Sequence, residues 1–342
     1  MADGSILREE TARSIRNLAS GTGDATPAII AAAHKCNNGG TVYFPAGQTY
    51  TVATALDLTF LSSVDFAILG TIQFKDDLTY WQAHAFQYKF QTASLFWRFG
   101  GSDVNIYGAG TGVIDGLGNT WWKAWASNSS VARPILFGTD GLNGATISGL
   151  KMKNPPNWFN LYANSTDILV SDMDLSAVSN DSSVAVKCTG SHGISVGSLG
   201  QYQGEVDIAE NIYIYNISMT NATDGARIKI WPGVAAGTTG STAGGGTGYV
   251  RNITYDTYQN KNNDPLTQCY STTAAVCAAN PSTVVIEDIL FKSFSGITSK
   301  KYDPVVCGNI VAKDIHVTVP SGKNATYTCT NMNNTQLGLN CA

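Results

Sequence analysis

Short stretches in which apolar and polar residues alternate recur along most of the chain. The alternation is clearest at 104–107, 145–148, 168–171, 212–215, 284–287 and 310–313. A period of two is the signature of β-strands, whose successive side chains point to opposite faces. The stretches end in Asn, Gly, Asp or Ser, which favour turns. The pattern therefore predicts many short strands joined by tight turns.

The spacing of these strands indicates how they pack. Ile147 and Leu169, at equivalent places in two neighbouring stretches, are 22 residues apart, and dipeptides typical of hairpin turns are scarce. Short strands at this density allow a sandwich, a barrel or a solenoid. A recurrence at this spacing favours a parallel β-helix, in which each coil stacks on the previous one. We therefore expect an all-β solenoid.

Two segments depart from the strand pattern. Residues 26–34 form an amphipathic stretch with Thr26 as the expected N-cap and Pro27 at the first helical position. We expect a helix near 26–36 that covers the apolar end of the stack. Residues 233–248 are rich in Gly, Ser and Thr. They predict a long flexible loop and not a phosphate-binding loop, because no Gly-Lys-Ser/Thr follows.

Composition excludes several classes of protein. The chain has 342 residues, 43% of them hydrophobic and only 13% charged, with a formal net charge of −4. A coiled coil and a disordered chain are excluded, as is nucleic acid as a partner, because no basic stripe could neutralise phosphates. No apolar run is long enough for a membrane helix. We expect one β-helix domain over 23–342, preceded at 1–22 by a polar extension or by a start that replaces a removed leader.

Other features suggest a secreted glycoprotein. Asn-x-Ser/Thr sequons occur at Asn128, Asn164, Asn180, Asn216, Asn221, Asn252, Asn324 and Asn333. Among the seven cysteines, Cys269 with Cys277 and Cys329 with Cys341 are close enough to close short loops, although sequence alone does not fix connectivity. The four histidines are scattered and no Cys-x-x-Cys occurs, so no metal site is expected.

The densest group of chemically active residues lies between 180 and 231. If neighbouring coils are about 4.8 Å apart, Asp181, His192, Arg227 and Lys229 could line one groove. The carboxylate would serve as acid or base, and the histidine would orient it. Arginine and lysine would bind the carboxylate of an anionic sugar.

Here the sequence resembles a known family. The string Ser-His-Gly-Ile-Ser-Val-Gly-Ser-Leu-Gly-Gln-Tyr at 191–202, with Arg-Ile-Lys at 227–229, is similar to fungal polygalacturonases of glycoside hydrolase family 28. The similarity is greatest to the exo-acting and xylogalacturonan-type branch. It implies a right-handed parallel β-helix that hydrolyses α-1,4-linked galacturonan with inversion and needs no cofactor. Tyr270 matches a substrate-binding tyrosine of the family.

The departures from that family concern the catalytic acids. The family carries Asn-Thr-Asp, then Asp-Asp-Cys, then Gly-His-Gly on successive coils, and no Asn-Thr-Asp precedes His192 here. The stretch 180–187 resembles the Asp-Asp-Cys segment, with Asp181 retained but Ser182 and Ser183 in place of the second Asp and the Cys. At least one coil is missing between Asp174 and Cys188. In the family, Cys36, Cys188 and Cys307 would have partners that are absent here, so we expect them to be thiols.

Each candidate also has a structural interpretation. His192 could be a hydrogen-bonded structural residue, Asp181 a solvated loop residue, and Tyr270 a packing residue. Arg227 and Lys229 could simply line a solvated face. For Asp76-Asp77 and for Trp97, Trp121 and Trp122, the structural interpretation is preferred, and the sequence leaves Asp207 undecided.

We therefore predict a secreted, monomeric pectin-active glycosidase that acts on galacturonan and is catalytically impaired. His192 and Asp181 would form its catalytic centre, and Arg227, Lys229 and Tyr270 would bind substrate. The alternative is a non-catalytic pectin-binding protein on the same scaffold.

Overall fold

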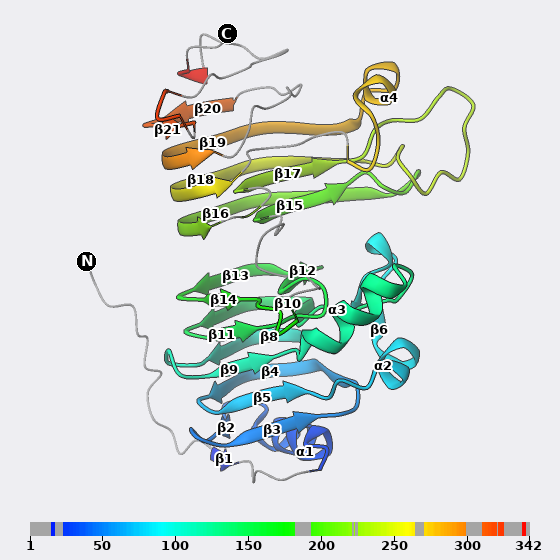
Figure 1. Cartoon of the computed structure of the whole chain (residues 1–342). Helices are drawn as coiled ribbons and strands as arrows, with labels where there is room; N and C mark the ends of the chain where they lie inside the picture. Colours follow the sequence, from blue (N-terminus) through cyan, green and yellow to red (C-terminus); the bar gives the residue numbers. More distant parts are fainter. Residues whose placement is uncertain are drawn as a thin grey trace. The chain divides into compact units, whose positions relative to one another are not determined.

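Parallel strands stacked in successive coils make up most of the protein. The computed structural model describes residues 15–17, 23–181, 193–220, 222, 225–263, 270–298, 310–319, 321–324 and 337–339. The chain divides into two compact units, residues 1–187 and 188–342 (Figure 1). The predicted all-β, parallel β-helical fold is confirmed. The expectation of one domain over 23–342 stays a prediction.

The first unit contains two parallel sheets. The larger has the strand order β1-β2-β4-β8-β10-β12, with β13 also paired to β10, and the smaller has the order β14-β11-β9-β5-β3. The strands of the larger sheet are β1 Ile15–Asn17, β2 Thr41–Phe44, β4 Leu56–Ile68, β8 Trp97–Tyr107, β10 Phe137–Ser148, β12 Asn160–Ala163 and β13 Thr166–Ser171. Those of the smaller are β3 Thr49–Val52, β5 Thr71–Phe74, β9 Val113–Asp115, β11 Lys151–Lys153 and β14 Asp174–Ser176. A separate antiparallel pair is formed by β6 Phe86–Gln87 and β7 Ser94–Leu95.

The core of this unit is built from columns of side chains that lie above one another on successive coils. Val42, Phe66, Ile106 and Ile147 are aligned in register and fully buried. Burying each such side chain contributes about 1.5–3 kcal/mol. Ile147 pairs with Val170, the residue directly after the Leu169 that the sequence pattern had suggested. Val170 ends the column and is 38% exposed.

The expected helix α1 extends over Thr26–Cys36 and buries one face against the first coils, closing the core (Figure 1). Its predicted capping is wrong. Ala25 occupies the N-cap without a side-chain bond, and Asp24 Oδ1 accepts from Thr26 N at 3.1 Å. The Thr26 hydroxyl instead donates to Thr54 O at 3.1 Å. The Thr26 hydroxyl therefore bonds to a carbonyl oxygen on another segment and does not cap the helix as the local pattern had predicted.

Further helical segments occur where coils are enlarged by insertions: α2 Leu78–His84, the 3₁₀ turn η1 Phe90–Thr92 and α3 Gly118–Ser127. The sequence did not predict these segments. Asp77 caps α2 by accepting from Tyr80 N at 3.0 Å. Asp76 accepts from the Thr120 hydroxyl at 2.9 Å. The tryptophans Trp97, Trp121 and Trp122 are buried, which agrees with the structural interpretation of all these residues.

The tight corners between strands are aligned as well. Asn164, Asn216 and Asn252 have positive φ angles of 49°, 57° and 53°. Asparagine tolerates this left-handed conformation better than most residues. At one corner Asn252 Nδ2 donates to Asn211 Oδ1 on the preceding coil at 2.8 Å. The turn-forming residues thus also connect neighbouring coils.

The second unit repeats the same architecture. One parallel sheet has the order β16-β18-β19-β20, with β21 also paired to β19, and a second consists of β15 and β17. Its elements are β15 Ile194–Leu199, β16 Val206–Thr220, β17 Ala226–Ile230, β18 Thr247–Asn263, α4 Ala274–Ala279, β19 Thr283–Thr298, β20 Ile310–Lys313 and β21 His316–Thr318. No helix within the described ranges is long and apolar enough to span a membrane.

Two of the seven cysteines lie among the described residues. Cys36 is a buried thiol whose Sγ lies 3.2 Å from Thr41 O, as expected. Cys277 is disulfide-bonded, also as expected. Its predicted partner Cys269 lies outside the described residues, as do Cys188, Cys307, Cys329 and Cys341.

Candidate active site

Arg227 and Lys229 project from one face of β17. Ala226, Ile228 and Ile230 alternate with them and pack into the core of the second unit, so the strand's period of two places both cations on the opposite face. That face is nevertheless covered, because Arg227 is 8% and Lys229 only 5% exposed. β17 pairs in parallel with β15, where Gly197 lies opposite Lys229.

The sequence string that suggested the family has a local structural reason at Gly197. A Cβ atom at this position would lie 2.3 Å from the carbonyl oxygen of Lys229. Glycine therefore lets β15 approach β17 closely beside the lysine. The residue after it, Ser198, accepts a hydrogen bond at Oγ from Trp231 Nε1 at 3.0 Å. The string thus helps to fix the end of β17.

Tyr270 completes the arrangement. Its ring centroid lies 4.9 Å from Lys229 Nζ and 5.7 Å from Arg227 Cζ. Trp231 packs edge-on against the same ring, at 5.3 Å and 80°. Tyr270 N also donates to Ile230 O at 3.0 Å, which anchors the tyrosine to β17. We call Arg227, Lys229 and Tyr270 the cationic cluster.

The cationic cluster has the chemistry of an anion site. Two positive side chains, both more than nine-tenths buried, lie near one aromatic ring. Cation–π attraction holds such charges more firmly where water is excluded. A guanidinium can bind a carboxylate through two parallel hydrogen bonds, and an ammonium adds a compact charge. Sequence reasoning selected all three residues, and the structure brings them together.

Asp181 has a different environment. It belongs to the first unit, where its Oδ2 lies 3.1 Å from Lys123 Nζ on α3. Its backbone N donates to Ser179 Oγ at 3.1 Å. The side chain is 29% exposed, and an ion pair this accessible contributes only about 0–1 kcal/mol. His192, Ser182 and Ser183 lie outside the described residues, so the catalytic roles of His192 and Asp181 stay predictions.

Asp207, which the sequence left undecided, has a structural contact. Its Oδ2 accepts from Gly200 N at 2.8 Å, just after β15. The backbone of Arg227 is held similarly, because the buried Tyr255 hydroxyl donates to Arg227 O at 3.0 Å. Sequence reasoning did not single out Tyr255 or Ser198, because their partners are distant in the chain.

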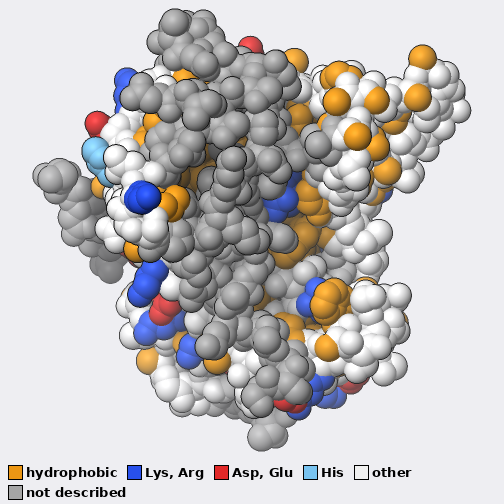
Figure 2. Space-filling model, turned by 45° about the horizontal axis from the view of Figure 1, so that its top comes forward, with side chains coloured by type: hydrophobic (Ala, Val, Ile, Leu, Met, Phe, Trp, Pro, Cys, Tyr) orange, Lys and Arg blue, Asp and Glu red, His pale blue; other side chains and the backbone are white. Residues whose placement is uncertain are grey.

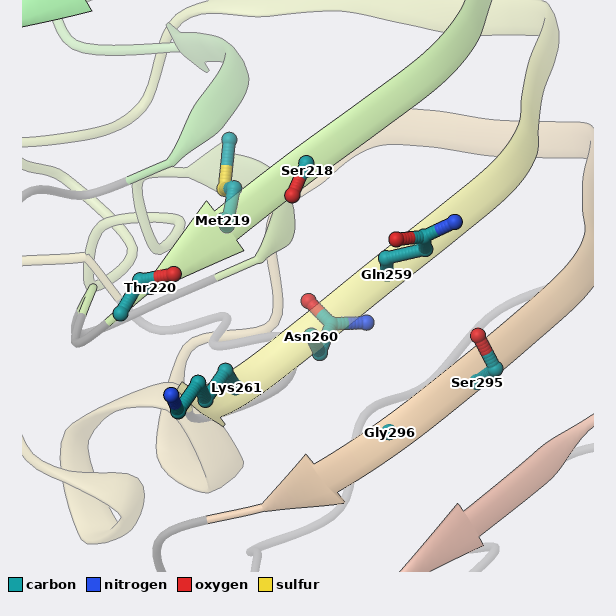
Figure 3. Close-up of a pocket in the computed structure, with 8 residues that line it drawn as sticks. All are labelled: Ser218, Met219, Thr220, Gln259, Asn260, Lys261, Ser295 and Gly296. Atoms are coloured by element: carbon teal, nitrogen blue, oxygen red, sulfur yellow. The ribbon is translucent and has the colours of Figure 1, made fainter.

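A pocket of about 300 Å³ lies elsewhere in the second unit, across β16, β18 and β19 (Figure 3). It is lined by Ser218, Met219, Thr220, Gln259, Asn260, Lys261, Ser295 and Gly296. None of these carries a carboxylate or an imidazole, so the lining offers no acid–base pair for glycoside hydrolysis. Within the described ranges, no group of three or more His, Cys, Asp or Glu could hold a metal ion.

Comparison with known proteins identifies the family of this chain. A family model described as glycosyl hydrolases family 28 matches residues 36–185 and 178–338. The chain belongs to this family. It is a family 28 glycosidase of the polygalacturonase type, as the resemblance implied.

Individual relatives are similar over nearly the whole chain. Exopolygalacturonase A of Aspergillus niger is 55% identical over 376 residues, covering 93% of this chain and 86% of the relative. The exopolygalacturonase of Cochliobolus carbonum is 44% identical, covering 93% and 83%. Among solved structures, endo-xylogalacturonan hydrolase from Aspergillus tubingensis matches with a TM-score of 0.76 and 31% identity, covering 96% of this chain and 99% of that one.

The length of the first match shows how many positions of the alignment have no counterpart in this family 28 chain. The alignment has 376 positions, of which this chain fills 93% of 342, or about 318, so about 58 positions (376 − 318) have no counterpart in it. The two segments of the family match meet at 178–185. The first compact unit ends close by, at Lys187.

Proposed function

We propose that this family 28 chain binds galacturonan through the cationic cluster and hydrolyses it far more slowly than its relatives. The observation that carries the proposal is the burial of Arg227 and Lys229 beside Tyr270. A charge-assisted bond to one galacturonate carboxylate would contribute about 1.5–3 kcal/mol. The names of the relatives, exopolygalacturonase and xylogalacturonan hydrolase, support the choice of saccharide.

The positions missing from this chain favour slow hydrolysis. Inverting glycosidases need one carboxylic acid and one carboxylate about 6.5–9.5 Å apart. The family resemblance puts these acids on two successive coils before the histidine. The roughly 58 missing positions (376 − 318) exceed two coils as short as the one from Ile147 to Val170. Asp181, the residue expected to survive, is paired with Lys123. Losing an acid or a base costs about 10²–10⁴-fold each.

The proposal also includes the localisation, oligomeric state, cofactors and partners of the protein. We infer an extracellular, monomeric protein that needs no cofactor and has neither nucleic acid nor membrane as a partner. The acidic composition and net charge of −4 support the exclusion of nucleic acid. The alternative function, a pectin-binding protein with no turnover at all, differs only in the residual rate.

The test measures binding and turnover on one preparation. Titration calorimetry should detect hexagalacturonate binding, weaker at about 1 M than at about 0.1 M salt. Arg227→Ala should abolish that binding. Reducing-end release should stay far below the roughly 1–10³ per second of ordinary enzymes. Turnover in that range would overturn the proposed impairment, and absence of binding would overturn the proposed site.

A further inference from the structure

A glycine-rich loop, residues 233–246, begins shortly after β17 and extends beyond α4 (Figure 1). Gly237, Gly240, Gly244 and Gly245 have positive φ angles of 86°, 68°, 127° and 86°. Glycine loses more conformational freedom on ordering than any other residue. A loop of this composition therefore needs contacts from another segment to keep one shape.

Gln203 supplies those contacts from the neighbouring segment. Its Nε2 donates to Thr238 O at 2.7 Å, and its Oε1 accepts from Ser241 N at 3.2 Å. Its backbone N also donates to Ser241 O at 3.0 Å. One side chain thus fixes both a donor and an acceptor group of the loop's outer half.

The base of the loop is closed by separate bonds. Gly245 N donates to Pro232 O at 3.0 Å, and Gly244 N donates to Gln201 O at 2.7 Å. Gly233 N donates to Asn280 O, the C-cap of α4, at 2.9 Å. Because the base does not depend on the Gln203 side chain, replacing that side chain should loosen the outer half alone.

The loop lies at one end of the sheet that carries the cationic cluster. It follows β17, and the segment that contains Gln203 follows β15, the parallel neighbour of β17. Trp231, whose ring packs on Tyr270, is joined to the loop through Pro232. In Figure 2, hydrophobic side chains gather on the projecting arm at the upper right, where the loop and α4 lie.

We infer that Gln203 is a positioning residue for saccharide binding. By holding the loop in one shape, it presents a preformed wall to the sugar units beside the one bound at the cationic cluster. A preformed wall lowers the entropy lost on binding. The inference rests on the proposed function and deepens it: the loop makes the site favour oligomers over a short fragment.

The experiment compares Gln203→Ala with Gln259→Ala, a matched control at an exposed position of β18 away from the loop. Calorimetry is carried out with digalacturonate and with hexagalacturonate. Gln203→Ala should weaken hexagalacturonate binding about tenfold and digalacturonate binding less than about twofold. Gln259→Ala should change neither. Amide hydrogen exchange at 237–243 should become faster only in Gln203→Ala.

The binding results distinguish a failure of the role proposed for Gln203 from a failure of the proposed function. If the unmodified protein binds hexagalacturonate and Gln203→Ala binds it equally tightly, only the role of Gln203 is overturned. An equal loss for both oligomers would mean general damage and would also overturn it. If the unmodified protein binds neither oligomer, the proposed function falls together with this inference.

Discussion

Replacing Lys229 by methionine separates the charge of this side chain from its packing. Lys229 is only 5% exposed, and its Nζ lies 4.9 Å from the centre of the Tyr270 ring. Methionine has a similar length and keeps an apolar contact with the ring, because sulfur–aromatic contacts contribute about 0.3–1.5 kcal/mol. We therefore expect Lys229→Met to keep its packing against the ring and to fold.

Saccharide binding by Lys229→Met should be weaker than binding by the unmodified protein. The lost charge-assisted bond to a galacturonate carboxylate is worth about 1.5–3 kcal/mol, so the Kd for trigalacturonate should rise about 10- to 150-fold. Titration calorimetry measures this change, and urea unfolding confirms that the fold is intact. Lys261→Met is the matched control, because it removes the same charge from an exposed position on β18.

A small effect would refute the reasoning. If Lys229→Met changed the Kd less than about threefold while Lys261→Met changed it equally, the cationic cluster would not be the saccharide site. A large fall in unfolding free energy for Lys229→Met would instead show that the buried ammonium is a structural charge.

Three further predictions test other parts of the molecule. Phe66→Ala should lower the unfolding free energy by about 3–5 kcal/mol in urea, because Phe66 is fully buried in the core column. The hydrogen bond from Lys292 lowers the pKa of Asp256, so the ionised carboxylate stabilises the fold above about pH 4 and this contribution is lost as pH falls further. Asp256→Asn should therefore be less stable at pH 7 and decline less between about pH 4 and 2 when urea unfolding is compared. In a secretory host, peptide mass spectrometry should find more glycan on Asn128 than on Asn164, because Asn164 Nδ2 already donates to a β10 carboxylate at 2.9 Å.

The features that the sequence predicted correctly are those encoded locally. A period of two was enough to place Arg227 and Lys229 on one face of a strand, and motif similarity added Tyr270. Asparagine at strand margins predicted corners, and Asn216 and Asn252 occupy them with positive φ. In each case neighbouring residues along the chain contain the whole signal.

The features that were missed depend on contacts between distant residues. Thr26 had the right identity for a cap, but its hydroxyl found Thr54 O, 28 residues away. The flexible loop expected at 233–248 is tied down by Gln203, which lies far upstream in the chain. Single-sequence patterns carry no record of such partners, because many pairs of polar residues could form the same bond.

The register of the coils also has an evolutionary consequence. The coil that leads from Asp65 to its partner Asn105 is much longer than the coil that leads from Thr146 to its partner Leu169. Extra chain such as α2 and the β6–β7 pair is accommodated at the edge without shifting the aligned columns. Since each coil contacts chiefly its nearest neighbours, the stack tolerates gain or loss of chain in whole turns. Descent in this family can therefore alter chemistry by deleting a turn while the sequence on either side stays recognisable.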